Sequence, residues 1–291
     1  MLHPFPESKW DERFSEANQH LATDSLEHGQ VLYFPQLAFV LLPEETQFLS
    51  PDYADPRSKN IGYHPDLNKL WGVQRLIDDE RIKLKMMIHR FYQASRKLVE
   101  QLLPRYAGPL INGRTSFRPV QINDRQTSSR KDDKRLHIDA FPSAPNQGKR
   151  ILRVFCNVNP HGESRIWRLG EPFEKVAQRF VPQIKKPFPG QAALLRLFKI
   201  TKSYRSLYDH YMLHIHDSMK ADEQYQQEVN YQTVHFPAGS TWIVQTDDVS
   251  HAAMQGQYVL EQTFYLPVSA MQNEALAPVR VLERLVGEEL V

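Results

Sequence analysis

One short segment places an imidazole and a carboxylate where both could bind one metal ion. It reads RLHIDAFPS from position 135 to 143. In an extended backbone, His137 and Asp139 point to the same side, because successive side chains alternate between the two faces of a strand. A neutral imidazole beside a carboxylate provides two of the three ligands of a 2-His-1-carboxylate iron site. The pair therefore predicts part of a non-haem iron centre.

The third ligand of such a centre has to come from a distant part of the chain. His251 is the candidate, because it follows a strand-like segment at 241–245 and a short turn. Three protein ligands on one face of the metal leave positions open for a cosubstrate and for oxygen. The alternative is that His137 and Asp139 only pair with each other or with the basic residues just before them.

A buried arginine is expected on the strand that follows the pair, over residues 150–158. The period-two rule gives this strand an apolar face made by Leu152, Val154, Cys156 and Val158, and an opposite face with Arg153, Phe155 and Asn157. If both faces are covered, Arg153 needs an anionic partner, because an unpaired buried charge is very costly. The distal carboxylate of 2-oxoglutarate would pair with it bidentately. An edge strand with Arg153 in water is the alternative.

A competing metal pattern occurs further along the chain. In the segment HYMLHIHD, positions 210 to 217, His210 and His214 would share one face of a helix, as in zinc enzymes. The glutamate that follows the first histidine of the hydrolytic motif is replaced by Tyr211. Packing, helix capping or substrate contact is therefore favoured for this segment over metal-dependent hydrolysis.

Two basic clusters could contact an anionic substrate. Arg130 and Lys131 lie shortly before the candidate ligands, in a stretch that is either a solvated loop or part of the mouth of the site. Arg165 and Arg168 flank Trp167, and cations beside an aromatic ring suit an acidic sugar or a phosphate.

The elements that would position these residues are helices first and strands afterwards. Apolar residues recur at near-helical spacing between about positions 74 and 101, which predicts a long helix ended by Pro104. A second helical stretch is expected over about 201–226. From about position 110 onward, short strands separated by Pro, Gly and Asn turns indicate a sandwich or jelly roll. The expected fold class is α+β, a jelly-roll core buttressed by α-helices.

Composition and charge set the broad class of protein. With 291 residues, 41% hydrophobic and 24% charged, the chain can bury a full core without disulfides. The net charge of +2 argues against a nucleic-acid partner. Cys156, the only cysteine, lies in an apolar run and is expected to be buried and inert, which fits a reducing cytosol. A secretory signal and a membrane span of about 20 apolar residues are both missing, so a soluble cytoplasmic protein is expected.

Several stretches closely resemble the family of hydroxylases that act on Kdo, 3-deoxy-D-manno-oct-2-ulosonic acid. They are HIDAFPS from 137, RILRVFCNVNP from 150, RIWRLGEPFE from 165, TSFRP from 115, YDH from 208 and HAAMQGQYVLEQTFYLP from 251. The resemblance covers most of the chain. It implies one oxygenase domain over 1–291, with a double-stranded β-helix (jelly-roll or cupin-like) core at about 110–270 and helical support at about 74–103.

The resemblance also implies a function. Such enzymes are Fe(II)- and 2-oxoglutarate-dependent dioxygenases that use O2 to hydroxylate C3 of a Kdo unit on Kdo-lipid A, in the lipopolysaccharide inner core. They release succinate and CO2. The implied partner is a Kdo-containing lipid A precursor, an anionic glycolipid, and the implied place is the cytoplasm, with peripheral contact at the inner face of the inner membrane. The alternatives are the same chemistry on another substrate, such as a protein side chain, and a non-catalytic sugar-binding jelly roll.

The iron motif of the family maps onto His137, Asp139 and His251. Many relatives in the wider superfamily hold the cosubstrate with an arginine about ten residues after the distal histidine. Here that neighbourhood reads Glu-Gln-Thr from 261 to 263, without an arginine. The cosubstrate anchor is therefore expected elsewhere in this chain.

This departure favours Arg153 as the anchor for 2-oxoglutarate. Asn157 lies on the same strand face as Arg153, and Gln262 could add a hydrogen bond. The Kdo carboxylate and the lipid A phosphates need cationic partners, for which the candidates are Arg118, Arg130, Lys131, Arg165 and Arg168.

Overall fold

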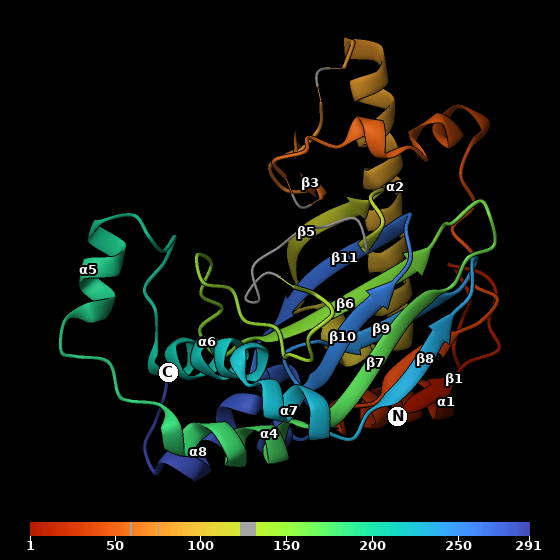
Figure 1. The fold of residues 1–291 in the computed structure, drawn as a ribbon. Coiled ribbons are helices and arrows are strands. Elements are labelled where there is room, and N and C mark those ends of the chain that lie inside the picture. Colours follow the sequence, from red (N-terminus) through yellow and green to blue (C-terminus); the bar gives the residue numbers. More distant parts are fainter. Residues whose placement is uncertain (59, 75, 123–131) are drawn as a thin grey trace.

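The computed structural model describes residues 1–58, 60–74, 76–122 and 132–291. In these ranges the strands form two sheets that face each other (Figure 1). The large sheet has the order β1-β2-β9-β6-β11-β5-β3-β4 and the small sheet the order β10-β7-β8. Every neighbouring pair is antiparallel except β1 with β2. The strands are β1 (Leu2–Pro4), β2 (Val31–Phe34), β3 (Ile61–His64), β4 (Lys69–Trp71), β5 (Ile111–Arg118), β6 (Arg150–Asn157), β7 (Arg165–Pro172), β8 (Gln232–Phe236), β9 (Thr241–Gln245), β10 (Val249–Gln255) and β11 (Val259–Leu266).

Helices separate many of the strands and end the chain. The α-helices are α1 (Glu16–Glu27), α2 (Asp78–Leu102), α3 (Pro104–Ala107), α4 (Phe173–Phe180), α5 (Gln191–Leu197), α6 (Leu207–Ala221), α7 (Glu223–Glu228) and α8 (Pro278–Val286). Short 3-10 helices are η1 (Pro43–Phe48), η2 (Pro51–Tyr53), η5 (Val181–Gln183), η6 (Val268–Ala270) and η7 (Glu274–Leu276). The expected α+β class is thereby confirmed.

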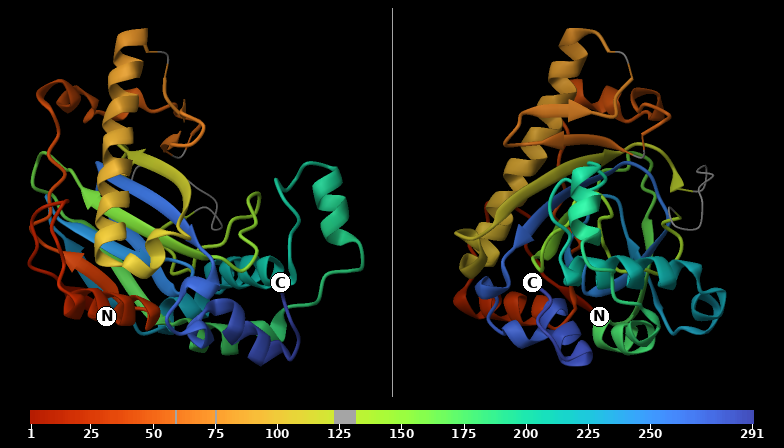
Figure 2. Two further views of the ribbon diagram at one scale, coloured as in Figure 1. Left: turned by 180° about the vertical axis from the view of Figure 1, so that it is seen from behind. Right: turned by 90° about the vertical axis from the view of Figure 1, so that its left-hand side faces the viewer.

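Helix α2 covers the outer face of the large sheet, as Figure 2 shows from behind. Leu84, Ile88 and Phe91 recur on one side of this helix and are fully buried. Burying a side chain of this size stabilises the fold by about 1.5–3 kcal/mol. The helix expected at about 74–101 is thus the buttress of the β-sheet, and it packs on β5 and β11.

Strand β6 is buried on both faces, as its composition predicted. Leu152, Val154 and Cys156 belong to the core between the sheet and the helices, whereas Phe155 belongs to the core between the two sheets. Burial raises the pKa of the Cys156 thiol to about 11. The thiol is therefore protonated at neutral pH and lies away from solvent, which confirms the inert role expected for it.

The space between the two sheets is filled at one end by stacked aromatic rings. Trp242 on β9 stacks on Phe236 of β8 with ring centroids 4.0 Å apart, and on Phe155 of β6 at 5.2 Å. Trp167 of β7 packs edge-on against Trp242 at 5.6 Å. Aromatic pairs of this kind contribute about 0.5–1.5 kcal/mol each beyond the area that they bury. They fix the distance between the two sheets at this end of the space.

The helical stretch expected over about 201–226 begins later than predicted, at Leu207, and is divided into α6 and α7, because two capping side chains set these boundaries. Ser206 starts α6: its hydroxyl accepts a hydrogen bond from the backbone N–H of Asp209, and Asp209 accepts one from the backbone N–H of Ser206. This reciprocal capping box fixes the first turn. Asp222 ends α6 and caps α7 through the N–H of Tyr225, 2.9 Å away.

No helix in the described part of the chain is both long enough and apolar enough to cross a membrane.

Candidate metal centre

His137, Asp139 and His251 come together at the open end of the space between the sheets. One ligand atom from each lies within 4.8 Å of the others. Two backbone hydrogen bonds hold the histidines opposite each other: the N–H of His137 donates to the carbonyl of His251 at 3.0 Å, and the reverse bond measures 2.8 Å. The N–H of Asp139 donates to the carbonyl of Thr246 at 2.8 Å. The backbone therefore fixes all three positions before any side chain binds an ion.

Hydrogen bonds also set which nitrogen of each imidazole faces the centre. Nδ1 of His137 lies 2.8 Å from the carbonyl oxygen of Arg135, and Nδ1 of His251 lies 2.8 Å from that of Val249. Since a carbonyl only accepts, each Nδ1 carries the proton, and Nε2 is left as the ligand atom. Burial lowers the pKa of both histidines. Both imidazoles are therefore neutral at neutral pH, as metal ligands have to be.

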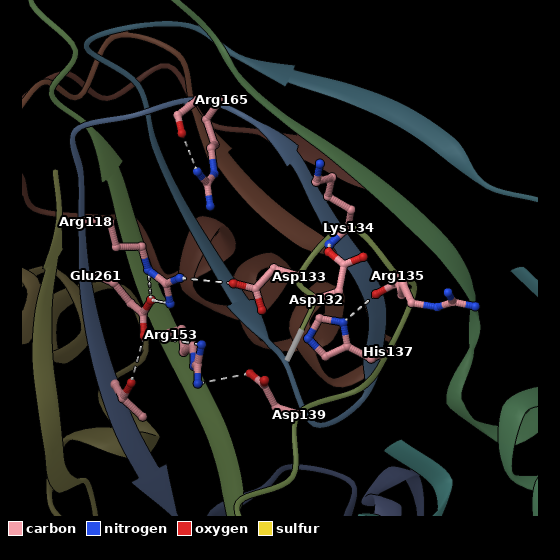
Figure 3. A network of polar contacts seen from close by, with 12 residues as sticks. Arg118, Asp132, Asp133, Lys134, Arg135, His137, Asp139, Arg153, Arg165 and Glu261 are labelled. Atoms are coloured by element: carbon pink, nitrogen blue, oxygen red, sulfur yellow. Dashed lines mark hydrogen bonds and ion pairs between the residues drawn. The ribbon is translucent and has the colours of Figure 1, made fainter. Parts of the chain in front are cut away.

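Asp139 is joined to strand β6 through Arg153. An Nη atom of Arg153 lies 3.1 Å from Oδ2 of Asp139, and the other Nη lies 3.3 Å from Oε1 of Glu261 on β11 (Figure 3). Burial alone would raise the pKa of Asp139, but Arg153 and the two histidines lower it below its ordinary value. Asp139 is therefore a carboxylate, the form that binds a cation.

Glu261 is shared between arginines. Arg118 of β5 donates from Nε to Glu261 at 2.8 Å and from an Nη to the same oxygen, and its other Nη lies 3.8 Å from Asp133. Burial would raise the pKa of Glu261, but Arg118, Arg153 and Arg114 lower it to about 2. Arg118 and Arg153 also lie near Asp133 and Asp139, so the three arginines face three carboxylates on this wall of the site.

Trp167 brings a hydrogen-bond donor into the same space from the small sheet. Its ring stacks on the imidazole of His251 with centroids 5.0 Å apart and a tilt of 21°. The ring is buried, and within the described ranges its Nε1–H finds no acceptor. A buried donor without an acceptor is destabilising and uncommon. An anionic ligand beside His251 would satisfy it.

Two of the expected cosubstrate contacts do not reach the site. Gln262 points to the opposite face of β11 from Glu261, where it accepts a hydrogen bond from Thr115 and donates to the carbonyl of Thr263. Asn157 is buried at the far end of β6, and its amide donates to the carbonyls of Glu163 and Phe236. Gln262 therefore links β11 to β5, and Asn157 holds the end of β6, whereas Arg153 lies at the centre, as expected.

The expected substrate-binding cations are spread over three kinds of place. Arg118 lies in the network of arginines around Glu261. Arg165 is buried on the interior face of β7, two residues before Trp167, and donates to the carbonyl of Gly256 at 2.9 Å. Arg168 lies on the opposite face of β7 with its guanidinium 4.3 Å from the ring centre of Tyr231, so it does not face the site. Arg130 and Lys131 lie outside the described residues.

The competing histidine pattern does not form a second centre. Nε2 of His210 lies 2.8 Å from the carbonyl of Lys185, and its ring contacts that of His214 at 4.3 Å. Within the described ranges, His137, Asp139 and His251 are the one group of three metal-ligating side chains. Helix α6 instead places His216 edge-on against His137, with ring centroids 5.4 Å apart.

Sequence reasoning missed several residues around the triad. Glu261, Asp133 and His216 contact it or its neighbours, and the ring of Phe141 lies within 6 Å of two guanidinium groups. The two guanidinium groups belong to Arg114 and Arg153. The period-two rule places Glu261 on the same face of β11 as Thr263 and Tyr265. The sequence could therefore have predicted which face of the strand Glu261 occupies. The other contacts depend on loop paths that the sequence pattern does not specify.

Two facing sheets with two neutral imidazoles and one carboxylate at their open end define the class of non-haem iron oxygenases with a jelly-roll core. A family model described as 3-deoxy-D-manno-oct-2-ulosonic acid (Kdo) hydroxylase matches residues 9–289. The chain therefore belongs to the Kdo hydroxylase family. No curated protein sequence matches it.

Solved structures of the Kdo hydroxylase KdoO, a non-haem Fe(II) alphaketoglutarate-dependent dioxygenase, have the same fold. Its apo structure is 47% identical with a TM-score of 0.96. The complex with alphaketoglutarate (2-oxoglutarate) and Fe(III) is 46% identical with a TM-score of 0.96, and the complex with succinate and Fe(III) is 46% identical with a TM-score of 0.95. In each case the match covers 100% of this chain and 97% of the other.

Proposed function

We propose that this chain is an Fe(II)- and 2-oxoglutarate-dependent dioxygenase that hydroxylates C3 of a Kdo unit on a Kdo-containing lipid A precursor. The observation that carries the proposal is the convergence of His137, Asp139 and His251 within 4.8 Å. The family membership and the KdoO complexes with Fe(III), 2-oxoglutarate and succinate support it. The whole chain, 1–291, acts as one oxygenase domain, with helical support at about 74–103 and the core at about 110–270.

The three side chains fit an iron(II) ion by their chemistry. Two neutral imidazoles and one carboxylate are the donor set of non-haem iron oxygenases. The hydrogen bonds from Nδ1 of His137 and His251 to carbonyl oxygens keep each Nε2 directed inward. When bound, iron(II) with 2-oxoglutarate and O2 supplies hydroxylation of a C–H bond, coupled to release of succinate and CO2.

The wall beside the triad offers a hydrogen-bond donor for the dianionic cosubstrate. Arg153 contacts Asp139 and Glu261 through its two Nη atoms. Its Nε–H is buried and has no hydrogen-bond acceptor among the described residues, and a carboxylate of the cosubstrate would satisfy it. Arg153 is the proposed anchor, and the indole N–H of Trp167 is a second donor from the facing sheet.

The chain's own contribution to the reaction is orientation and the exclusion of water. Arg153 holds the carboxylate of Asp139 on the side away from solvent and would orient the cosubstrate from the same position. The stacked rings of Trp167, Trp242 and Phe155 close the space behind His251. Holding reactants in one orientation in a dry site is a large part of what an enzyme adds to such chemistry.

The proposed substrate is an anionic glycolipid, so the proposed place of action is the cytoplasmic face of the inner membrane. Arg118 and Arg165 lie inside the core and could contact the Kdo carboxylate at the inner end of its path. The roles suggested for Arg130 and Lys131 in holding phosphate groups remain predictions from the sequence, whereas Arg168 lies over Tyr231 and does not face the site.

Succinate formation with a panel of acceptors tests the proposal. Iron-loaded protein is given 2-oxoglutarate and O2 with a Kdo-capped lipid A precursor, with the same precursor lacking Kdo, and with a peptide mixture. We expect acceptor-dependent succinate only with the Kdo-capped precursor. Stimulation by the peptides alone would keep the oxygenase chemistry and overturn the substrate, and a protein that binds iron but forms no succinate would overturn the enzyme class.

A further inference from the structure

Residues 184–206, here called the basic arm, differ in charge from the rest of the chain. The basic arm connects η5 to α6 and includes helix α5 (Gln191–Leu197). It contains six basic residues and no acidic one, whereas the whole chain is nearly balanced at 36 basic and 34 acidic residues. The six are Lys185, Lys186, Arg196, Lys199, Lys202 and Arg205. Lys186 pairs with Glu288 at 2.7 Å, which ties one end of the arm to the C-terminal segment.

The basic arm also exposes large apolar side chains. Leu197 is 73% exposed and Phe198 is 71% exposed, and four further apolar or aromatic residues of the arm are exposed as well. The four are Phe188, Leu194, Ile200 and Tyr204. Helix α5 buries none of its residues. Surface helices of globular proteins normally bury one apolar face, so this helix lacks the partner that its side chains require.

The arm stands away from the body of the molecule, and its end returns to the metal centre. Figures 1 and 2 both show α5 projecting from the fold beyond α6. On the return, the N–H of Lys202 donates to the carbonyl of Ser143 at 2.9 Å, and Arg205 donates to the carbonyl of Pro142 at 2.5 Å. Ser143 lies four residues after Asp139. A surface bound by the arm would therefore adjoin the loop that leaves the proposed metal ligands.

We propose that the basic arm docks the protein on an anionic phospholipid bilayer. Leu197, Phe198 and their apolar neighbours enter the interface between head groups and acyl chains, and the basic side chains contact lipid phosphates. Exposed apolar residues interleaved with cations, without any acidic residue, are the composition that binds to anionic membrane surfaces. The purpose of docking rests on the proposed function, because the proposed substrate is a membrane lipid.

Charge also favours a bilayer over a second copy of the chain as the partner. Symmetric pairing of two arms would place six basic residues against six, and like charges repel. An anionic bilayer instead offers a continuous negative surface with an apolar layer beneath it. The one occupant that matches both properties of the arm is the bilayer.

Vesicle flotation with the full-length protein tests docking without any need for iron, 2-oxoglutarate or Kdo. The vesicles contain phosphatidylethanolamine with phosphatidylglycerol, or phosphatidylcholine alone. We expect the wild type to bind the anionic vesicles, less so at high salt, and not the neutral ones. The variant Leu197→Glu/Phe198→Glu should bind about tenfold or more weakly, since it removes apolar contacts and adds negative charge. Arg196→Glu/Lys199→Glu, which keeps the apolar residues, should also bind more weakly.

The matched control is Val40→Glu. Val40 is 73% exposed, like Leu197, and belongs to the segment between β2 and η1. This segment lies on the side of the molecule away from α5 (Figure 1). This variant should bind vesicles as the wild type does. Circular dichroism and melting temperature confirm that each variant is folded.

Several outcomes would overturn the docking proposal. One is a wild type that does not bind anionic vesicles, and another is equal binding by the wild type and Leu197→Glu/Phe198→Glu. Wild-type dimers that dissociate in that variant, without vesicle binding, would assign the arm to a second copy. Failure of docking leaves succinate formation with a detergent-solubilised substrate unchanged, so it is distinguishable from failure of the proposed function.

Discussion

An Nη atom of Arg153 lies 3.1 Å from Oδ2 of Asp139, a separation that links the proposed cosubstrate anchor directly to a proposed metal ligand. Strand β6 supplies the arginine, and the loop after position 137 supplies the carboxylate. Binding of the metal by Asp139 and binding of the cosubstrate by Arg153 would therefore both involve this one ion pair. Residues that orient metal ligands from behind typically change metal affinity or activity by about 10–100-fold when they are replaced.

The first prediction concerns Arg153. Arg153→Ala should raise the 2-oxoglutarate concentration needed for half-maximal turnover by about 10–100-fold, because the main cationic partner of the cosubstrate is lost. Anaerobic titration of the cobalt-loaded protein with 2-oxoglutarate, followed by visible absorption, measures the same change without turnover. Arg168→Ala is the matched control, since Arg168 lies on the opposite face of β7 over Tyr231. An unchanged requirement in Arg153→Ala would place the anchor elsewhere in the site.

The second prediction concerns the ligands themselves. His137→Ala, Asp139→Ala and His251→Ala should each abolish turnover and leave the protein folded. In the wild type, cobalt(II) at a hundred times its dissociation constant should stabilise the fold by about 2.7 kcal/mol. This rise in melting temperature should disappear in the three variants. His210→Ala should retain it, because the imidazole of His210 contacts the backbone carbonyl of Lys185 and belongs to no group of three metal-ligating side chains in the described ranges. Full activity in any of the three would remove that residue from the ligand set.

The third prediction concerns the indole N–H of Trp167. Trp167→Phe keeps an aromatic ring against His251 and Phe155 but removes the donor. Since a hydrogen bond to a charged group contributes about 1.5–3 kcal/mol, the affinity for 2-oxoglutarate should fall by about tenfold or more. Calorimetric titration of the cobalt-loaded protein measures it, and cobalt affinity serves as the internal control. Equal 2-oxoglutarate affinity in the two proteins would exclude Trp167 from cosubstrate binding.

The fourth prediction concerns stability and pH. Arg150 pairs with Asp247 at 2.8 Å and lies 3.5 Å from Asp248, yet burial outweighs this attraction and raises the pKa of Asp248 to about 7. A carboxyl whose folded-state pKa is raised binds its proton more tightly when folded. Its contribution to the free energy of unfolding is complete below its ordinary pKa near 3.8 and is lost as the pH rises to about 7.

Asp248→Asn removes this titration. From pH 5 to pH 8 the wild type should lose about 3 kcal/mol in free energy of unfolding relative to the variant, with the same denaturant slope in both proteins. Urea unfolding of both proteins at the two pH values measures the difference. Curves that stay parallel would show that Asp248 has its ordinary pKa in the folded state.

The sequence could predict those features that depend on local alternation or on short spacing. Alternation along β6 placed Arg153 on the inner face, and the spacing of His137 and Asp139 put both side chains in one site. The same rule places Gln262 with Leu260 and Phe264, on the face of β11 away from Arg153. The partners of Arg153 were not predictable, because they depend on the register between β6 and β11 and on the loop before Asp139.

Helix ends were less predictable than helix faces. Apolar periodicity gave the buried side of α2, but the boundaries of α6 and α7 depend on hydrogen bonds made by Ser206 and Asp222. Only residues 201–206 of the basic arm fell within the stretch that was assigned to a helix. The arm is exposed because α5 packs no buried face against any other element that the structure describes. Apolar periodicity in the sequence does not predict whether a helix has such a partner.

The most direct measurement is mass spectrometry of a Kdo-capped lipid A precursor after reaction with the iron-loaded protein, 2-oxoglutarate and ¹⁸O-labelled O2. We expect one labelled oxygen atom on the Kdo portion at C3, dependent on every addition and absent in His251→Ala. Succinate formed while the precursor stays unmodified would contradict the proposed substrate. An unmodified precursor without succinate, in protein shown to hold iron, would contradict the assignment of His137, Asp139 and His251 as an oxygenase centre.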